Sequence, residues 1–84
     1  MSYEIHIVHS AEKEFDALSG TTQKRIIKKI SFLEENPRPK GTCKLSGREE
    51  YRVRVGAYRI LYIIDDVNHT VTIVAIGHRR DVYN

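Results

Sequence analysis

Three arginines in one short segment are the side chains of this chain best suited to chemistry on an anion. They are Arg52, Arg54 and Arg59, within residues 51–62. The segment predicts a β-hairpin, because apolar and charged residues alternate along its first half and its second half is rich in β-branched and aromatic residues. Gly56 can open a two-residue turn, since glycine tolerates the positive φ needed there. Arg54 then lies directly opposite Arg59.

The predicted register places all three guanidinium groups on one face of the hairpin. The opposite face is apolar and is the candidate core surface, formed by Tyr51, Val53, Val55, Tyr58, Ile60 and Tyr62. Like charges directly opposite one another destabilise a sheet. A lone arginine is usually a solvated surface residue, but three arginines clustered by register are better explained by an anionic ligand.

The composition indicates one globular domain, residues 1–84. The hydrophobic fraction of 40% is adequate for a folded core, and the net charge is a modest +3 with a pI near 9.2. Cys43 is the only cysteine, so no intramolecular disulfide is possible, which suits a reducing compartment. A signal-peptide pattern and an apolar run of ~18 residues are both absent. We therefore expect a soluble, cytoplasmic protein that makes no membrane contact.

Two helices are expected between an N-terminal strand and the hairpin. Ser10 can cap the first helix, which ends near Ser19-Gly20, where glycine is the expected terminator. Thr21 can cap a second helix that runs to about Glu35, because the prolines that follow prevent its continuation. The short connection between them predicts an antiparallel helical hairpin.

The remaining segments complete the sheet. A polar turn follows the hairpin and leads to residues 71–76, a nearly continuous apolar run typical of a central strand. The turn contains adjacent Asp65 and Asp66, but no His or carboxylate stands at ligand spacing from them, so we expect no metal and no cofactor. The fold class is predicted to be α+β: an antiparallel-rich four-stranded sheet with a helical hairpin packed on one face.

Further polar residues could extend the arginine cluster. The C-terminal tail contains His78, Arg79, Arg80 and Tyr83, and the loop before the hairpin contains Lys44 and Arg48. The tail is either a frayed polar end, as chain termini often are, or an extension of the last strand that brings its side chains to the rim of the basic face.

An early strand, a helical hairpin and three motifs, residues 36–38, residues 51–62 and residues 76–83, together extend over essentially the whole chain. On these motifs the chain resembles the RelE branch of the RelE/ParE toxin superfamily, as a single RelE-like toxin domain. The last two motifs are fairly specific in combination. The resemblance implies a bacterial or archaeal toxin that cleaves messenger RNA in the ribosomal A site without a metal. It also implies partners, namely the 70S ribosome, its mRNA, and a cognate antitoxin in a hetero-oligomeric complex.

The resemblance also implies roles for single side chains. The implied catalytic residues are Arg52, Arg54, Arg59, Arg79 and Tyr83. The candidate RNA-binding residues beside them are Lys44, Arg48, His78 and Arg80. Arg59 would neutralise the pentavalent phosphate, and Arg52 or Arg54 would stabilise the attacking oxygen. Arg79, or Arg80 in its place, would serve the leaving oxygen, and Tyr83 would stack on a base. No residue is assigned as general base, because arginine stays protonated.

Two other functions fit the same scaffold or the same charge. One is inhibition of DNA gyrase by a ParE-like protein that is not a nuclease, although the arginine cluster with Tyr83 argues against it. The other is a basic RNA-binding module without toxicity, which would show salt-sensitive binding and no cell killing. Cleavage of a translated message, as opposed to gyrase-stabilised DNA breaks, would separate these functions.

Overall fold

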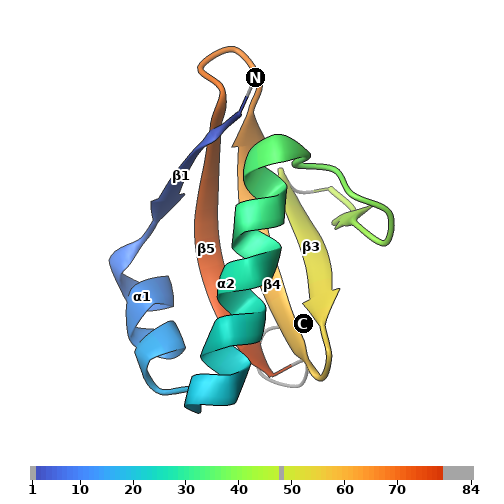
Figure 1. Ribbon diagram of the computed structural model, residues 1–84. Helices are drawn as coiled ribbons and strands as arrows, with labels where there is room; N and C mark the ends of the chain where they lie inside the picture. Colours follow the sequence, from blue (N-terminus) through green and yellow to red (C-terminus); the bar gives the residue numbers. More distant parts are fainter. Residues whose placement is uncertain (1, 48, 79–84) are drawn as a thin grey trace.

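A computed structural model describes residues 2–47 and 49–78 of the chain. Two helices and five strands follow one another along this part of the chain (Figure 1). In chain order they are β1 Glu4–Ile7, α1 His9–Asp16, α2 Gly20–Glu35, β2 Cys43–Lys44, β3 Glu50–Val55, β4 Tyr58–Asp65 and β5 Thr70–His78. Neither of these helices has the length and apolar character needed to cross a membrane.

The strands form one mainly antiparallel sheet in the order β1-β5-β4-β3-β2. β1 runs parallel to β5, and every other neighbouring pair is antiparallel. Both helices lie on the same face of the sheet, with α1 beside β5 and α2 crossing in front of the central strands (Figure 1). The predicted α+β class is therefore confirmed. The sheet has five strands where four were predicted, because the edge strand β2 has only two residues and is too short to show an alternating pattern.

The first helix begins earlier than predicted. Its N-cap is Val8, which makes no side-chain cap bond, so Ser10 lies inside the helix. Val8 has extended backbone, and its N–H donates to the carbonyl of Ile73 in β5 at 3.1 Å. Strand pairing therefore continues up to the first helical residue, and this pairing fixes where α1 starts.

The second helix also begins earlier, at Gly20. Its cap is Ser19, whose Oγ accepts a hydrogen bond from the backbone N–H of Thr22 at 3.3 Å. Thr21 was predicted as the cap, but several cap-forming residues adjoin here and the serine comes first. Gly20 consequently opens α2 and does not terminate α1. The predicted end at Glu35 is confirmed.

The β3–β4 hairpin has the predicted register. Val55 pairs with Tyr58 and Arg54 pairs with Arg59, which leaves Gly56 and the following alanine as the turn. Gly56 has a φ of 61°, in the left-handed region that glycine occupies without strain. Turn chemistry and alternation therefore determine which side chains of the hairpin share a face.

The hydrophobic core lies between the sheet and the two helices. Its buried members are Ala11, Ile26, Leu33, Val53, Val55, Ile60, Tyr62, Val71, Ile73 and Ile76. Tyr51 and Tyr58 are partly buried and pack against them, so all six residues of the predicted apolar face take part. The Tyr62 hydroxyl donates to the carbonyl of Pro37 at 2.7 Å. This bond satisfies a buried polar group and ties the loop after α2 to the sheet.

An ion pair joins the same loop to the turn between β4 and β5. Arg38 makes two bonds to the carboxylate of Asp66, at 2.8 and 3.2 Å, and the Tyr3 hydroxyl donates to Asp66 at 2.7 Å. The hydrogen bonds from Arg38 lower the pKa of Asp66 most, and the bond from Tyr3 adds to them. Together they lower this pKa from 3.8 to about 2. Asp65 accepts from two backbone N–H groups of its own turn. Both aspartates thus have structural partners, and the described residues contain no cluster of side chains arranged to hold a metal ion.

Candidate functional site

The surface of the sheet that faces away from the helices carries the three arginines. Arg54 lies directly opposite Arg59 across the hairpin. Arg52 points to the same side as Arg54, because side chains alternate along a strand and the intervening Val53 is buried in the core. The predicted grouping of the three on one face is confirmed. We refer to Arg52, Arg54 and Arg59 as the arginine face.

The members of the arginine face differ in exposure. Arg54 is exposed and Arg52 is partly buried, whereas Arg59 is only 4% exposed. Arg59 belongs to β4, which lies between β3 and β5 in the interior of the sheet. A buried charge is screened less by water than an exposed one, and packing fixes its position. The face therefore combines one preorganised cation with two more accessible ones, an arrangement suited to a phosphate that gains negative charge.

The edge strand β2 brings a thiol to the border of this face. Cys43 pairs with Arg52 across β2 and β3, so the two side chains lie on the same side of the sheet. The Cys43 thiol is free and exposed. Because it is the only thiol of the chain, it offers a single attachment point for a probe beside the arginine face.

Lys44 lies on the other side of the sheet from the arginines. It pairs with Tyr51, whose side chain packs on the helix side. The predicted contact of Lys44 with RNA therefore involves a different surface, at the edge of the sheet, and stays a prediction. The predicted site residues Arg48, Arg79, Arg80 and Tyr83 lie outside the described residues, and their roles also stay predictions.

His78, at the end of β5, is likewise on the helix side. It pairs with Tyr58, and the two rings meet edge to face with centroids 5.7 Å apart. The rings line a hollow of about 300 Å³ beside Glu14 of α1. The Glu14 carboxylate accepts a hydrogen bond from the backbone N–H of Ile76 at 2.9 Å, which joins α1 to β5. The structure does not bring His78 to the arginine face, and its predicted RNA contact stays a prediction.

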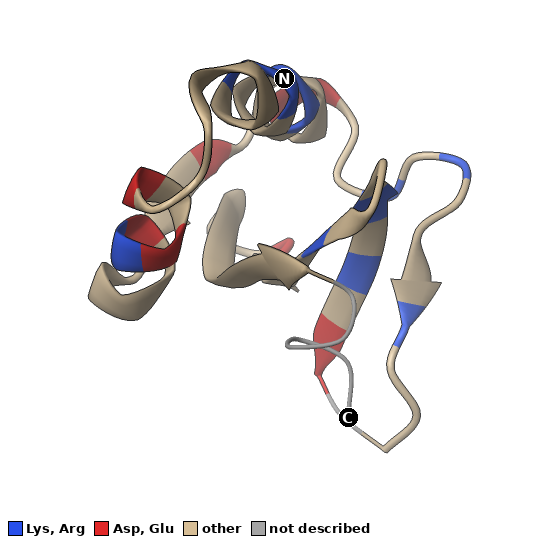
Figure 2. Cartoon of the chain, turned by 90° about the horizontal axis from the view of Figure 1, so that it is seen from below, with Lys and Arg blue, Asp and Glu red and all other residues tan. Residues whose placement is uncertain are grey.

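Arg25 of α2 is a cation near the hairpin tip that the sequence did not single out. A Cβ atom placed on Gly56 would lie 3.2 Å from Nη2 of Arg25 and 3.5 Å from its Cζ, so the guanidinium packs against the turn. Figure 2 shows basic residues both along α2 and on the strands of the hairpin. The positive surface therefore extends around the hairpin tip to the helix side. No local pattern signals this contact, because it joins elements that are distant in sequence.

Known proteins are similar to this chain in sequence along nearly its whole length. Residues 5–83 match the family described as the ParE toxin of the type II toxin–antitoxin system parDE. A RelE-like toxin protein of Escherichia coli is 29% identical, over 100% of this chain and 93% of that protein. Toxin RelG of Mycobacterium tuberculosis is also 29% identical, over 99% of this chain and 98% of that protein.

The fold is also that of solved structures. A chain of the archaeal RelE–RelB complex from Pyrococcus horikoshii OT3 superposes with a TM-score of 0.84 at 26% identity, covering 94% of this chain and 97% of that chain. The shared architecture, a helical pair on one face of a mainly antiparallel sheet, is the one found in RelE-type proteins. With the match over residues 5–83, the chain belongs to the ParE toxin family of type II toxin–antitoxin systems, within the RelE/ParE superfamily.

Proposed function

We propose that this protein is a toxin that acts as a ribosome-dependent endoribonuclease, cleaving mRNA in the A site. The observation that carries the proposal is the arginine face, where Arg54 and Arg59 stand directly opposite each other on the side of the sheet without helices. Relatives that are RelE-like toxins support this activity. The protein would act in the cytoplasm, where it meets ribosomes.

The cleavage needs charge stabilisation more than covalent chemistry. The 2′-oxygen of a nucleotide attacks its own phosphorus, and the bond from phosphorus to the 5′-oxygen of the next nucleotide breaks. The 2′-hydroxyl loses a proton and the departing 5′-oxygen gains one, so the products are a 2′,3′-cyclic phosphate and a 5′-hydroxyl. Arg59 is positioned by burial to stabilise the pentavalent phosphorane, and a single such donor is typically worth ~10²–10³ in rate.

Proton transfer is the weak part of this site. Arg52, Arg54 and Arg59 stay protonated at neutral pH and are poor general bases. They can stabilise an alkoxide, but they cannot efficiently create one. Alignment of the message by the ribosome would compensate, since correct positioning alone is worth up to ~10 kcal/mol of the barrier. Tyr83 as a base-stacking residue and Arg79 or Arg80 at the leaving oxygen complete the proposed site.

The proposed partner is a cognate antitoxin, in a complex of both chains. The archaeal relative of this fold was solved as a RelE–RelB complex, and family membership places the chain in a type II toxin–antitoxin system. A toxin that stops translation needs such a partner in its host cell. Co-expression of the antitoxin should therefore restore growth.

Inhibition of DNA gyrase is the second candidate function. It is favoured by one observation, the description of the matching family as the ParE toxin. The two functions predict different damage: shortened messages in a translation reaction, or gyrase-stabilised breaks in supercoiled DNA. A basic RNA-binding module without toxicity would produce neither, and its binding would fall steeply with salt.

The deciding experiment is primer extension on a message translated in a reconstituted system with added toxin. We expect cleavage by the wild type and a loss of ~10²-fold or more in Arg54→Ala, since one charge donor is removed. Lys13→Ala is the control, because Lys13 is an exposed cation on α1. Intact message with folded wild-type protein, or equal cleavage by Arg54→Ala, would refute the proposal.

A further inference from the structure

A carboxylate lies on the same side of the sheet as the arginine face. Glu50 is the first residue of β3, and Arg52 and Arg54 follow it at two and four positions along the strand. Because side chains alternate along a strand and the intervening Tyr51 and Val53 pack on the helix side, Glu50 points to the side of the arginines. Figure 2 shows acidic positions at the start of this strand and basic positions further along it. The cationic surface of β3 therefore has an anionic end.

The pairing of β3 with β4 supports this orientation. Glu50 stands opposite Ile63, and the register continues without a shift from this pair to the hairpin turn. The next residue, Ile64, packs against the core, so Ile63 points away from the helices. Glu50 is partly buried and its Oε1 atom is shielded from water, so packing restrains the carboxylate. The Cα atoms of Glu50 and Arg52 are ~7 Å apart, close enough for both side chains to contact one nucleotide.

The proposed cleavage needs a proton acceptor that the three arginines do not provide. A guanidinium group stays protonated at neutral pH, whereas an ionised carboxylate can accept the proton of a hydroxyl group. Removal of that proton by a positioned side chain typically contributes ~10²–10⁴ in rate. A carboxylate alone repels an RNA phosphate, but the neighbouring guanidinium groups attract the phosphate and offset this repulsion. A carboxylate at the end of a row of arginines is therefore compatible with RNA binding.

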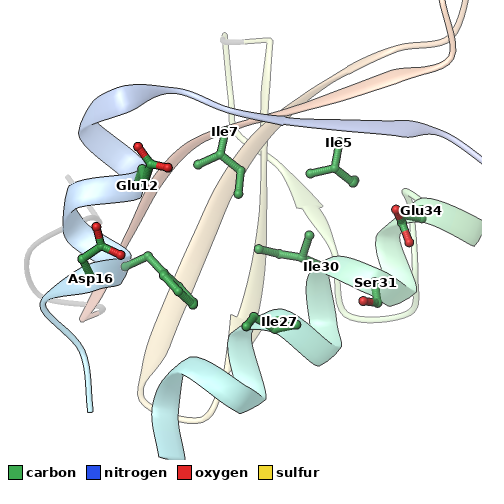
Figure 3. A pocket seen from close by; sticks show the side chains of 9 residues that line it. Ile5, Ile7, Glu12, Asp16, Ile27, Ile30, Ser31 and Glu34 are labelled. Carbon is green, nitrogen blue, oxygen red and sulfur yellow. The ribbon is translucent and has the colours of Figure 1, made fainter. Parts of the chain in front are cut away.

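Carboxylates on other elements are poorly placed for this task. Glu12, Asp16 and Glu34 line a groove between β1 and the helices, on the opposite side of the sheet (Figure 3). Glu4 of β1 shares the side of the arginines, and its carboxylate lies 3.4 Å from the imidazole of His6. β1 is three strands away from β3, or ~14 Å at ~4.8 Å per strand, so neither Glu4 nor His6 reaches the arginines of β3. Among these groups, Glu50 alone adjoins the arginine face.

We propose that Glu50 is the general base of the cleavage reaction. Its carboxylate takes the proton of the 2′-hydroxyl as the 2′-oxygen attacks phosphorus, while the guanidinium groups of the arginine face hold the phosphate. The bond from phosphorus to the 5′-oxygen of the next nucleotide breaks, and that oxygen takes a proton from water. Glu50 then releases its own proton to water. The proposal rests on the nuclease function above and assigns the proton transfer that the arginines cannot perform.

Two matched substitutions of adjacent residues test the role of Glu50. Glu50→Gln keeps the size of the side chain but removes its ability to accept the proton, so single-turnover cleavage on programmed ribosomes should slow by ~10²-fold or more. Its affinity for the ribosome should stay within about twofold of the wild type, because the lost interaction acts on the reaction. Glu49→Gln is the control, since Glu49 lines a hollow in the loop before β3, and its cleavage rate should stay within about twofold. Cleavage by Glu50→Gln at the wild-type rate would overturn the proposal.

Glu50→Asp and urea unfolding distinguish a general base from a structural carboxylate. Aspartate keeps the proton-accepting group, so Glu50→Asp should cleave faster than Glu50→Gln. If Glu50 served only as a hydrogen-bond acceptor at a fixed distance, glutamine would be the better replacement, and that order of rates would overturn the proposal. Glu50→Gln should also unfold at a urea concentration close to that of the wild type. A large drop in this midpoint would assign Glu50 to folding and would likewise overturn its catalytic role.

A comparison of codons separates proton transfer from base recognition. A carboxylate can also accept a hydrogen bond from the amino group of a nucleobase. Since every nucleotide of the message carries a 2′-hydroxyl, Glu50→Gln should slow cleavage by a similar factor at each codon tested. A loss confined to codons with one base would assign Glu50 to base recognition and overturn its role as general base. A folded wild type that leaves every message intact would remove the nuclease together with this proposal, whereas cleavage that Glu50→Gln matches would remove the role of Glu50 alone.

Discussion

Replacing Arg59 by methionine removes a buried charge and keeps an unbranched side chain. Arg59 is 4% exposed and lies directly opposite Arg54. Two unit charges separated by ~4–8 Å at an effective dielectric constant of ~20 repel by roughly 2–4 kcal/mol, and water around the exposed Arg54 reduces this further. Losing the interactions of the Arg59 guanidinium group costs about as much. The free energy of unfolding of Arg59→Met should therefore lie within ~1 kcal/mol of the wild type.

Arg59→Ala should behave differently in the same measurement. Truncation also removes the packed stem of the side chain and leaves a cavity, so it should be less stable than Arg59→Met by about 1–3 kcal/mol. Relief of repulsion considered alone predicts the opposite, a fold left intact or slightly improved by Arg59→Ala. Urea unfolding of both variants distinguishes the two expectations. The burial of Arg59 favours a loss of stability in Arg59→Ala.

The activity of the two variants should fall together. Single-turnover cleavage on programmed ribosomes should slow by ~10²–10³ in both, since both lack the preorganised charge. Arg59→Lys should recover only part of the rate, because lysine offers a point charge without the planar fork. A folded Arg59→Met that cleaves at the wild-type rate would refute the transition-state role of Arg59.

Three further perturbations test single contacts. The pKa of Asp66 is about 2 in the folded protein against an ordinary 3.8, so its bonds stabilise the fold above ~pH 4 and cease to do so as the pH falls through 2. Asp66→Asn should therefore unfold at lower urea than the wild type at pH 7, with the gap closing near pH 2. A bulky maleimide on Cys43 should slow cleavage about 10-fold by crowding Arg52, whereas Cys43→Ser given the same reagent should keep its rate. Gly56→Ala should lose about 1–2 kcal/mol in thermal unfolding, because φ is 61° there; an unchanged Tm would contradict the turn geometry.

The hairpin could be predicted from sequence because two local signals agree on its register. Alternation from Tyr51 to Val55 assigns side chains to faces, and Gly56 fixes where the chain reverses. Together they determine that Arg54 meets Arg59, and the structure has this pairing. A wrong turn position would have moved one arm's side chains to the other face, so the agreement of both signals carried the site prediction.

Features that depend on distant contacts could not be predicted in this way. The ion pair between Arg38 and Asp66 joins residues 28 positions apart, and neither residue's neighbours indicate the other. The packing of Arg25 on Gly56 is of the same kind. The burial of Arg59 follows from the position of β4 inside the sheet, whereas its sequence context shows only which face it occupies.

Alternation along β3 and β4 assigns folding and chemistry to different side chains of the same two strands. Val53 and Ile60 are directly opposite each other and belong to the core, and the next pair along the hairpin, Arg54 and Arg59, belongs to the other face. Substitutions in the first pair should therefore act on stability, and substitutions of Arg54 on activity. Arg59 is the exception, because it is as buried as the core valine while pointing to the charged face. The contribution of Arg59 to stability and its contribution to cleavage can be separated only by an unbranched, uncharged side chain that fills the same space. Methionine meets this condition and alanine does not.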